Sequence, residues 1–221
     1  LSFENQKLEI DVGLHIGSFF AVITYFRKDI FNFVKNKGLF TKILLSSLPV
    51  MIVGYLLVKL NLIEQLRNVK IIGWTTLVFG IFLYFSDKCE TRKEIKDNFT
   101  FKSAFIIGLI QILSLVPGVS RSGITITGGR FLKFKRYDSA KISFLLSIPT
   151  LAAVSIFGFN NLLVSENFNF SILILLSVVF SFVFSLITIK YFLDYIKKFS
   201  LNIFVIYRIV LGVVLILTAY L

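Results

Sequence analysis

The residues best suited to chemistry lie in one short segment, Pro117–Thr125, which reads Pro-Gly-Val-Ser-Arg-Ser-Gly-Ile-Thr. Pro117 and Gly118 are expected to stop one helix, and Ser120 is expected to cap the next helix with its hydroxyl. A helix start carries unpaired N–H groups and partial positive charge, and Arg121 adds a planar guanidinium that matches phosphate. The segment therefore predicts an anion site.

Composition places this segment in a lipid environment. Of 221 residues, 56% are hydrophobic and only 16% are charged, and the mean hydropathy is +0.85. A soluble domain of this size would expose too much surface for that balance. The net charge of +12 lies in short gaps between apolar runs. We assign it to membrane topology and anionic headgroups, and expect no nucleic acid as a partner.

Apolar runs of about 20 residues, the length that crosses a bilayer, occupy most of the chain. The six runs, one of them short, are Leu8–Phe26, Leu39–Val58, Ile71–Phe85, Ser139–Asn160, Phe170–Ile189 and Ile203–Leu221. We therefore predict an all-α polytopic membrane protein that forms a single integral membrane domain over residues 1–221.

Basic residues orient the connections between these runs. Lys and Arg gather in Arg27–Lys42, Asp87–Thr100, Arg130–Lys141 and Lys190–Ser200, whereas Asn161–Asn169 has neither. Basic loops stay on the cytoplasmic side of a membrane. The four basic segments are therefore predicted inside, and the uncharged one outside.

The region Phe101–Arg130 is apolar but interrupted by Pro117 and several glycines. Its two flanking loops are predicted on the same side, and about thirty residues are too few for two spans. A re-entrant helix–loop–helix hairpin fits best, with its irregular backbone lining a cavity. An arginine at membrane depth is a functional-site hypothesis. The alternative for Arg121 is that it extends to the interface from a structural turn.

The spans repeat in two groups of three. Corresponding spans start about 130 residues apart, and three spans per half would make the halves inverted, as in many transporters. The halves are predicted as residues 1–100 and 101–221, with the hairpin at 101–130. At the same spacing, the partner hairpin of the first half falls upstream of Leu1, so this sequence is expected to lack it.

The segment Pro117–Thr125 resembles the Pro-Gly-x-Ser-Arg-Ser-x-x-Thr motif of the undecaprenyl-diphosphate phosphatase family, also called the bacitracin-resistance protein family. Gln111 stands before the motif as in that family, and Ser143–Pro149 resembles its Phe-Ser-Phe-Leu-Leu-x-Ile-Pro segment, with Ile142 in place of the first Phe. Weaker matches, in the first and last spans, are Asp11, His15, Gly17, Tyr207, Arg208 and Gly212. The resemblance covers essentially the whole chain.

The resemblance implies an enzyme that removes the terminal phosphate of a polyprenyl diphosphate at the outer face of the bacterial plasma (inner) membrane. This reaction recycles the lipid carrier for peptidoglycan synthesis and uses a divalent cation such as Mg²⁺ or Ca²⁺. By matching position, Ser120, Arg121 and Thr125 would be catalytic, with Arg121 holding the diphosphate. Further substrate-binding positions would be Ser122, Gly118, Gln111 and His15.

Part of the family's pattern does not occur in this sequence. The family has an N-terminal Glu-x-x-x-Glu motif followed by a Ser-Ser-Thr-Gly-His-like run, which holds its metal ligands and its nucleophile or base candidates. A hard cation takes several carboxylate oxygens, and the loop offers none beside Arg121. We therefore expect the metal ligands upstream of residue 1, and we expect this chain alone to be inactive.

Two other residues have competing interpretations. His15 lies four residues after Asp11 on one helix face, either as a structural pair or as part of the active-site wall. Arg208 lies early in the last span, where a structural pairing or an interfacial position competes with substrate contact.

Two further functional hypotheses compete with the phosphatase. Inverted repeats with an arginine-bearing hairpin also suit a transporter or flippase for a phospholipid or polyprenyl phosphate, and a shortened chain also suits an inactive remnant. Metal dependence with phosphate release favours the enzyme, whereas lipid exchange across the bilayer without release favours transport. The sequence leaves a homo-oligomer open.

Overall fold

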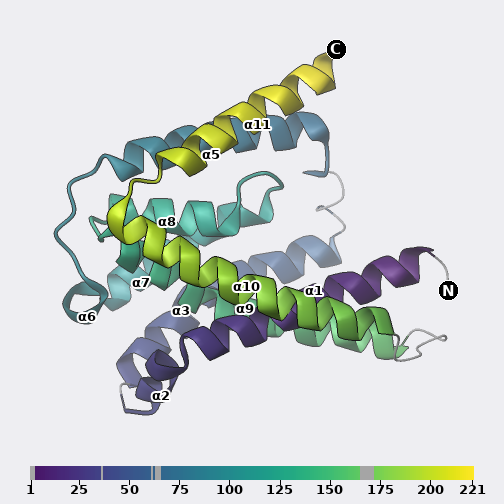
Figure 1. The fold of residues 1–221 in the computed structure, drawn as a ribbon, viewed down its shortest axis with the longest axis horizontal. Coiled ribbons are helices and arrows are strands. Elements are labelled where there is room, and N and C mark those ends of the chain that lie inside the picture. Colours follow the sequence, from purple (N-terminus) through teal and green to yellow (C-terminus); the bar gives the residue numbers. More distant parts are fainter. Residues whose placement is uncertain (1–2, 36, 61, 63–65, 165–171) are drawn as a thin grey trace. The chain divides into compact units, whose positions relative to one another are not determined.

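The computed structural model describes residues 3–35, 37–60, 62, 66–164 and 172–221, which are mostly helical (Figure 1). The elements are α1 (Phe3–Tyr25), α2 (Arg27–Lys35), α3 (Lys37–Lys59), α5 (Val69–Asp87), α6 (Ile95–Asn98), α7 (Phe101–Gln111), the 3-10 turn η1 (Ile112–Leu115), α8 (Arg121–Phe131), α9 (Arg136–Val164), α10 (Ile172–Lys198) and α11 (Asn202–Tyr220). The all-α prediction is confirmed.

Within the described ranges, five helices are long and apolar enough to cross a membrane: α3, α5, α10, α11 and residues Arg136–Asn160 of α9. In an apolar stretch of 18 residues within each of these segments, no more than 33% of the residues are buried inside the protein, so apolar side chains remain for contact with lipid. The chain is therefore a polytopic membrane protein. The sixth predicted span, Leu8–Phe26, is also helical, as α1, and its crossing of the membrane stays a prediction.

The basic connections are more helical than the sequence predicted. Arg27–Lys42 contains α2 and the start of α3, and most of Lys190–Ser200 belongs to the end of α10. The prediction of loops there was wrong because a helix does not have to end where its apolar run ends. Lysines in the last turn of a helix favour its continuation, as at Lys197 and Lys198 in α10. The segment Asn161–Asn169 lies largely outside the described residues.

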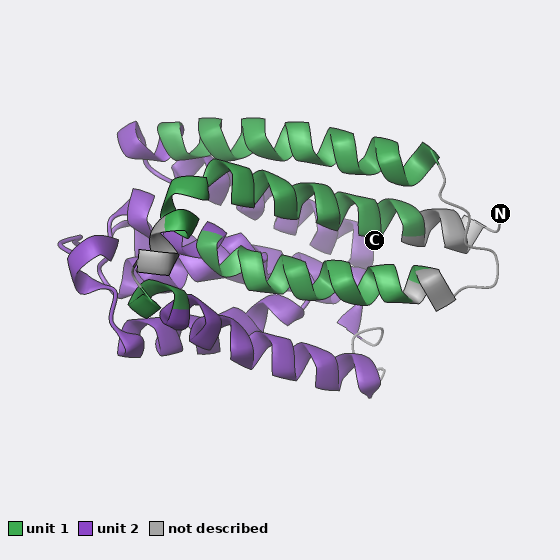
Figure 2. Ribbon diagram, turned by 90° about the horizontal axis from the view of Figure 1, so that it is seen from below, with its two compact units in different colours: residues 1–40, 145–194 green, residues 41–144, 195–221 purple. Residues whose placement is uncertain are grey.

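The chain divides into two compact units (Figure 2). Unit 1 comprises residues 1–40 and 145–194, and unit 2 comprises residues 41–144 and 195–221. Each unit takes segments from both predicted halves of the chain. The division therefore does not test the inverted repeat, which stays a prediction.

Small and hydroxylated residues bring α1 against α10 in unit 1. A Cβ at Gly17 would lie 2.4 Å from the carbonyl oxygen of Val178, so the two backbones approach too closely for any side chain there. Ser18 Oγ lies 3.0 Å from Ser181 Oγ and 3.1 Å from Ser185 Oγ. Small residues and hydroxyl contacts of this kind hold helices together in lipid, where apolar side chains have no preference for protein.

Unit 2 is built around α5 and α11, which lie side by side (Figure 1). Gly212 of α11 permits this close approach, because a Cβ there would lie 2.8 Å from the backbone nitrogen of Leu77. Helix α8 contacts both α5 and α7. Helix α5 is therefore a shared support for α8 and α11.

The interrupted region forms the predicted helix–loop–helix hairpin. Helix α7 ends at Gln111, η1 follows it, and α8 begins at Arg121. The two helices of the hairpin contact each other, and a Cβ at Gly128 of α8 would lie 3.1 Å from Ile110 Cδ1 of α7. The hairpin is therefore confirmed as a local structure, whereas its re-entry into the membrane stays a prediction.

Candidate functional site

The loop between η1 and α8 has an unusual backbone. Gly118 has φ +90° and Ser120 has φ 68°, values in the left-handed region that favours glycine. A Cβ at Gly118 would also lie 2.2 Å from Thr75 Oγ1, so glycine is required there on two grounds. A non-glycine residue such as Ser120 in this region costs about 1–3 kcal/mol, and such residues gather at functional sites.

Ser120 caps α8 as the sequence predicted. Its Oγ accepts a hydrogen bond from the N–H of Gly123 at 3.2 Å. Ser120 and Ser122 are exposed, with their hydroxyl oxygens 3.5 Å apart. Arg121 is the first residue of the helix and is half-buried. Two hydroxyls and a guanidinium thus accompany the positive end of the α8 dipole, an arrangement suited to a phosphate.

Three side chains outside the hairpin donate hydrogen bonds to backbone carbonyls of the loop. Thr75 Oγ1 of α5 donates to the carbonyl oxygen of Pro117 at 2.6 Å. Thr76 Oγ1 donates to the carbonyl oxygen of Gly118 at 3.2 Å, and Arg208 Nη2 of α11 donates to the same oxygen at 2.9 Å. These donors turn two loop carbonyls toward α5 and α11.

Arg208 has a structural role in this arrangement. Its side chain is buried, and Nη2 also lies 3.4 Å from the carbonyl oxygen of Thr76. Its Nη1 lies 3.5 Å from the point where a Cβ of Gly123 would stand, so the guanidinium reaches the first turn of α8. The structural pairing expected for Arg208 is therefore confirmed, and its partner is the loop itself.

Thr125 and Gln111 are predicted site residues that the structure buries. Thr125 Oγ1 lies 2.7 Å from Ser143 Oγ and 2.8 Å from the carbonyl oxygen of Arg121. Gln111 is 0% exposed, and neither atom of its amide has a hydrogen-bond partner in the described part of the chain. Thr125 thus helps to fix α8 against the start of α9. Direct contact of either residue with a ligand stays a prediction.

His15 lies in unit 1, whereas the loop lies in unit 2. Its Nδ1 is 2.6 Å from the backbone carbonyl oxygen of Asp11. The expected pairing therefore exists, but it uses the backbone of Asp11 and not its carboxylate. The place of His15 in the site stays a prediction.

A metal centre is not apparent among the residues that the structure describes. No group of three or more His, Cys, Asp or Glu side chains there could hold a metal ion. Because Mg²⁺ and Ca²⁺ take several oxygen ligands, largely carboxylates, the donors of the described loop do not fit such an ion. We assign no metal ligand.

Comparison with known proteins identifies the family. A family model described as "Bacitracin resistance protein BacA" matches residues 1–214. The chain belongs to this family. A protein of Pelagibacter ubique (strain HTCC1062) named undecaprenyl-diphosphatase is 47% identical over 219 residues, which cover 99% of this chain and 85% of that protein.

Other members of the bacitracin resistance family carry the same name. The undecaprenyl-diphosphatase of Saccharophagus degradans is 40% identical over 223 residues, covering 95% of this chain and 83% of that protein. That of Elusimicrobium minutum is 39% identical over 232 residues, covering 99% and 86%. The family resemblance first noted at Pro117–Thr125 is thus confirmed over nearly the whole chain.

Sequence analysis of this family member missed three residues that support the loop and α8. They are Thr75, Thr76 and Ser143, each a hydroxyl inside a helix that spans the membrane. Each is a hydroxyl residue within an apolar run. Such a residue indicates a hydrogen bond to a neighbouring helix, because hydroxyls in lipid pair with groups on other helices. The partner of each hydroxyl could not be read from the sequence, since it depends on how the helices pack.

Proposed function

We propose that this protein is an undecaprenyl-diphosphate phosphatase, a hydrolase that releases phosphate from the lipid diphosphate and returns undecaprenyl phosphate to peptidoglycan synthesis. Membership in the bacitracin resistance family and the names of the relatives support this proposal. The observation that carries it is the start of α8, where Ser120, Arg121 and Ser122 accompany the positive end of the helix dipole.

The chemistry assigned to this loop is binding and charge stabilisation. Arg121 and the start of α8 would hold the terminal phosphate and stabilise the charge that builds on its oxygens during transfer. Ser120 and Ser122 would add hydroxyl contacts, because both are exposed beside Arg121. The buried Thr125 would act by holding α8 against Ser143.

A divalent cation, Mg²⁺ or Ca²⁺, belongs to the proposal through the family resemblance. When bound, such a cation neutralises phosphate charge and polarises the phosphoryl oxygens. Its ligands are not assigned to described residues of this chain, because they offer no suitable cluster.

The proposal places the protein in the bacterial plasma membrane, with its substrate lipid as partner. Four basic segments support a cytoplasmic position for the ends that carry Asp87–Thr100 and Arg130–Lys141. The loop at Gly118–Ser120 lies at the opposite end of α8 from Arg130. It would then open toward the outer face, where the family resemblance places the reaction.

The test is phosphate release from undecaprenyl diphosphate by the protein purified in detergent together with any residues that precede Leu1, with Mg²⁺, with Ca²⁺ and with a chelator. We expect release that needs the cation, and a loss of about 100-fold or more in Arg121→Ala, because a charge-stabilising donor is removed. The variant must still insert into membranes. Absence of release from the wild type would contradict the proposal, and lipid exchange between leaflets without release would indicate a transporter.

A further inference from the structure

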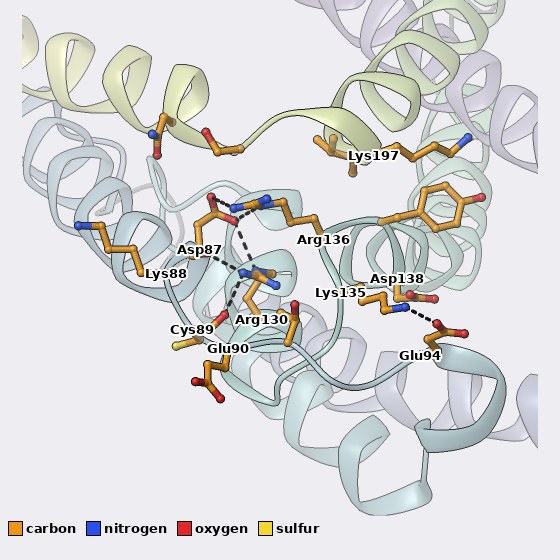
Figure 3. A pocket seen from close by; sticks show the side chains of 15 residues that line it. Asp87, Lys88, Cys89, Glu90, Glu94, Arg130, Lys135, Arg136, Asp138 and Lys197 are labelled. Atoms are coloured by element: carbon orange, nitrogen blue, oxygen red, sulfur yellow. Dashed lines mark hydrogen bonds and ion pairs between the residues drawn. The ribbon is translucent and has the colours of Figure 1, made fainter.

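A group of three charged residues, two of them buried, lies at the end of α8 far from the loop (Figure 3). Asp87 is the last residue of α5, Arg130 is in the last turn of α8, and Arg136 is the first residue of α9. The side chains of Arg130 and Asp87 are only 3% and 4% exposed. Charges buried this deeply are costly unless they are paired and hydrogen-bonded, so their partners indicate which segments they hold together.

Arg130 ties the end of α8 to the segment that follows α5. Its Nη2 donates to the carbonyl oxygen of Asp87 at 2.7 Å and to that of Cys89 at 3.2 Å. Its Nη1 donates to the carbonyl oxygen of Phe134 at 3.0 Å, and its Nε lies 3.5 Å from Asp87 Oδ1. One guanidinium thus joins the C-terminal end of α8 to the C-terminal end of α5.

Asp87 ties two further segments to the same point. Its Oδ1 accepts from Arg136 Nε at 2.6 Å and its Oδ2 accepts from Arg136 Nη2 at 3.0 Å, so the pair is bidentate. Its Oδ2 also accepts from the backbone N–H of Leu201, just before α11, at 3.1 Å. The carboxylate therefore fixes the start of α9 and the entry to α11 at the end of α5.

Helix α8 needs such attachments because its own sequence supports a helix poorly. Its eleven residues include Gly123, Gly128 and Gly129, and glycine is the weakest helix former after proline. A Cβ at Gly129 would lie 2.8 Å from Ser139 Oγ of α9, so the glycines serve close packing. The position of α8 is therefore set by its neighbours more than by its own propensity.

Helix α5 is bonded to both ends of this weak helix. Near its middle, Thr75 and Thr76 hold the carbonyls of the loop that precedes α8. At its last residue, Asp87 holds Arg130 in the last turn of α8. An α-helix rises about 1.5 Å per residue, so these two attachments set where α8 lies along α5. Release of the far attachment would leave the loop side, the Thr125–Ser143 hydrogen bond and side-chain packing to hold Ser120 and Arg121.

We propose that Asp87 and Arg130 are positioning residues, which act through α8 to set the place of Ser120 and Arg121 in the phosphate site. This inference rests on the proposed phosphatase function for its kinetic consequence, but not for its structural one. Neither residue touches the site itself. A small displacement of the binding groups is enough to slow a reaction strongly, because the reacting geometry is demanding.

The experiment compares Asp87→Asn with Glu94→Gln in the full-length protein. Glu94 and Lys135 form an ion pair between the same two connections, but their side chains are 50% and 51% exposed (Figure 3). Amide hydrogen exchange of residues 117–125 and the kinetics of phosphate release are measured for each variant. In Asp87→Asn we expect faster exchange in this loop and a kcat about tenfold lower with KM within about twofold. In Glu94→Gln we expect wild-type exchange in this loop and wild-type kinetics of phosphate release.

Arg130→Lys provides a second variant if Asp87→Asn does not fold. Lysine keeps the positive charge but lacks the fork that reaches three carbonyl groups, and we expect the same direction of change in the loop. Wild-type exchange of residues 117–125 in a folded variant of either kind would overturn the inference, even if exchange rose around Cys89. A wild-type protein without phosphate release would overturn the proposed function alone, because the exchange comparison would still decide the positioning role.

Discussion

Arg208 of α11 donates a hydrogen bond of 2.9 Å from Nη2 to the carbonyl oxygen of Gly118, the residue at which the loop turns before α8. A guanidinium within a membrane-spanning helix is costly unless it is paired. Here the guanidinium of Arg208 bonds a loop carbonyl and brings positive charge to the first turn of α8. The loop with Ser120 and Arg121 is therefore held by α11, a helix outside the hairpin.

The bond from Arg208 predicts a specific defect in Arg208→Met. Loss of the donor leaves the Gly118 carbonyl with Thr76 alone, and a hydrogen bond that involves a charged group contributes about 1.5–3 kcal/mol. We expect faster hydrogen exchange in residues 117–125 and a lower rate of phosphate release. Arg208→Lys serves as the comparison, because it keeps the charge and one donor. A Met variant with a wild-type loop and wild-type turnover would contradict this role.

Gly118 is predicted to tolerate no side chain. Alanine would combine φ +90° with a Cβ placed 2.2 Å from Thr75 Oγ1, and the backbone strain alone costs about 1–3 kcal/mol. We expect Gly118→Ala to lower the thermal unfolding temperature in detergent and to abolish phosphate release.

Gly54→Ala is the matched control for that change. A Cβ at Gly54 of α3 would lie 3.4 Å from Leu115 Cδ2, an ordinary contact, and alanine is a better helix former than glycine by about 1 kcal/mol. We expect unchanged or slightly raised stability. Equal losses in both variants would show that glycine is required in unit 2 generally, and not at the turn in particular.

Thr75→Val tests the hydroxyl that holds Pro117. Valine keeps the shape of threonine but removes the donor, so the Pro117 carbonyl loses its 2.6 Å partner and stability should fall by about 1–3 kcal/mol. Thr218→Val is the control, since Thr218 is exposed and its Oγ1 bonds the carbonyl oxygen of Leu215 in its own helix. We expect slower phosphate release from Thr75→Val and wild-type release from Thr218→Val.

The exposed pair of Glu94 and Lys135 predicts a weak pH dependence. The hydrogen bond and charge of Lys135 lower the pKa of Glu94, and those of Glu94 raise the pKa of Lys135. The contribution of Glu94 is present above its unfolded pKa and is lost as pH falls through the lowered folded value. That of Lys135 is present below its unfolded pKa and is lost as pH rises through the raised folded value.

The pair should therefore contribute between about pH 5 and pH 10, from the usual pKa values of the two groups. Unfolding temperatures of the wild type and Glu94→Gln, measured across this range at low and high salt, check this. We expect a small difference that shrinks with salt and in acid, because exposed pairs are screened by solvent. A large, salt-independent difference would show that the pair is more than a surface contact.

Several features of this protein follow from its sequence alone. The apolar runs determined that its helices cross a membrane, because about 20 apolar residues satisfy a bilayer in any arrangement. The Pro-Gly break and the capping hydroxyl of Ser120 determined that a helix begins at Arg121, because both effects act within a few residues. The motif over Pro117–Thr125 identified the family that the whole chain then matched.

Tertiary structure alone decided what holds these local features in place. Asp87 and Arg130 lie in different helices, and the loop residues Pro117 and Gly118 are bonded by Thr75 of α5 and Arg208 of α11. In the sequence Thr75, Thr76 and Arg130 are only polar residues within apolar or basic stretches. Hydrogen bonds require distances near 3 Å and suitable angles, and only the packing of α5, α8 and α11 brings these groups that close.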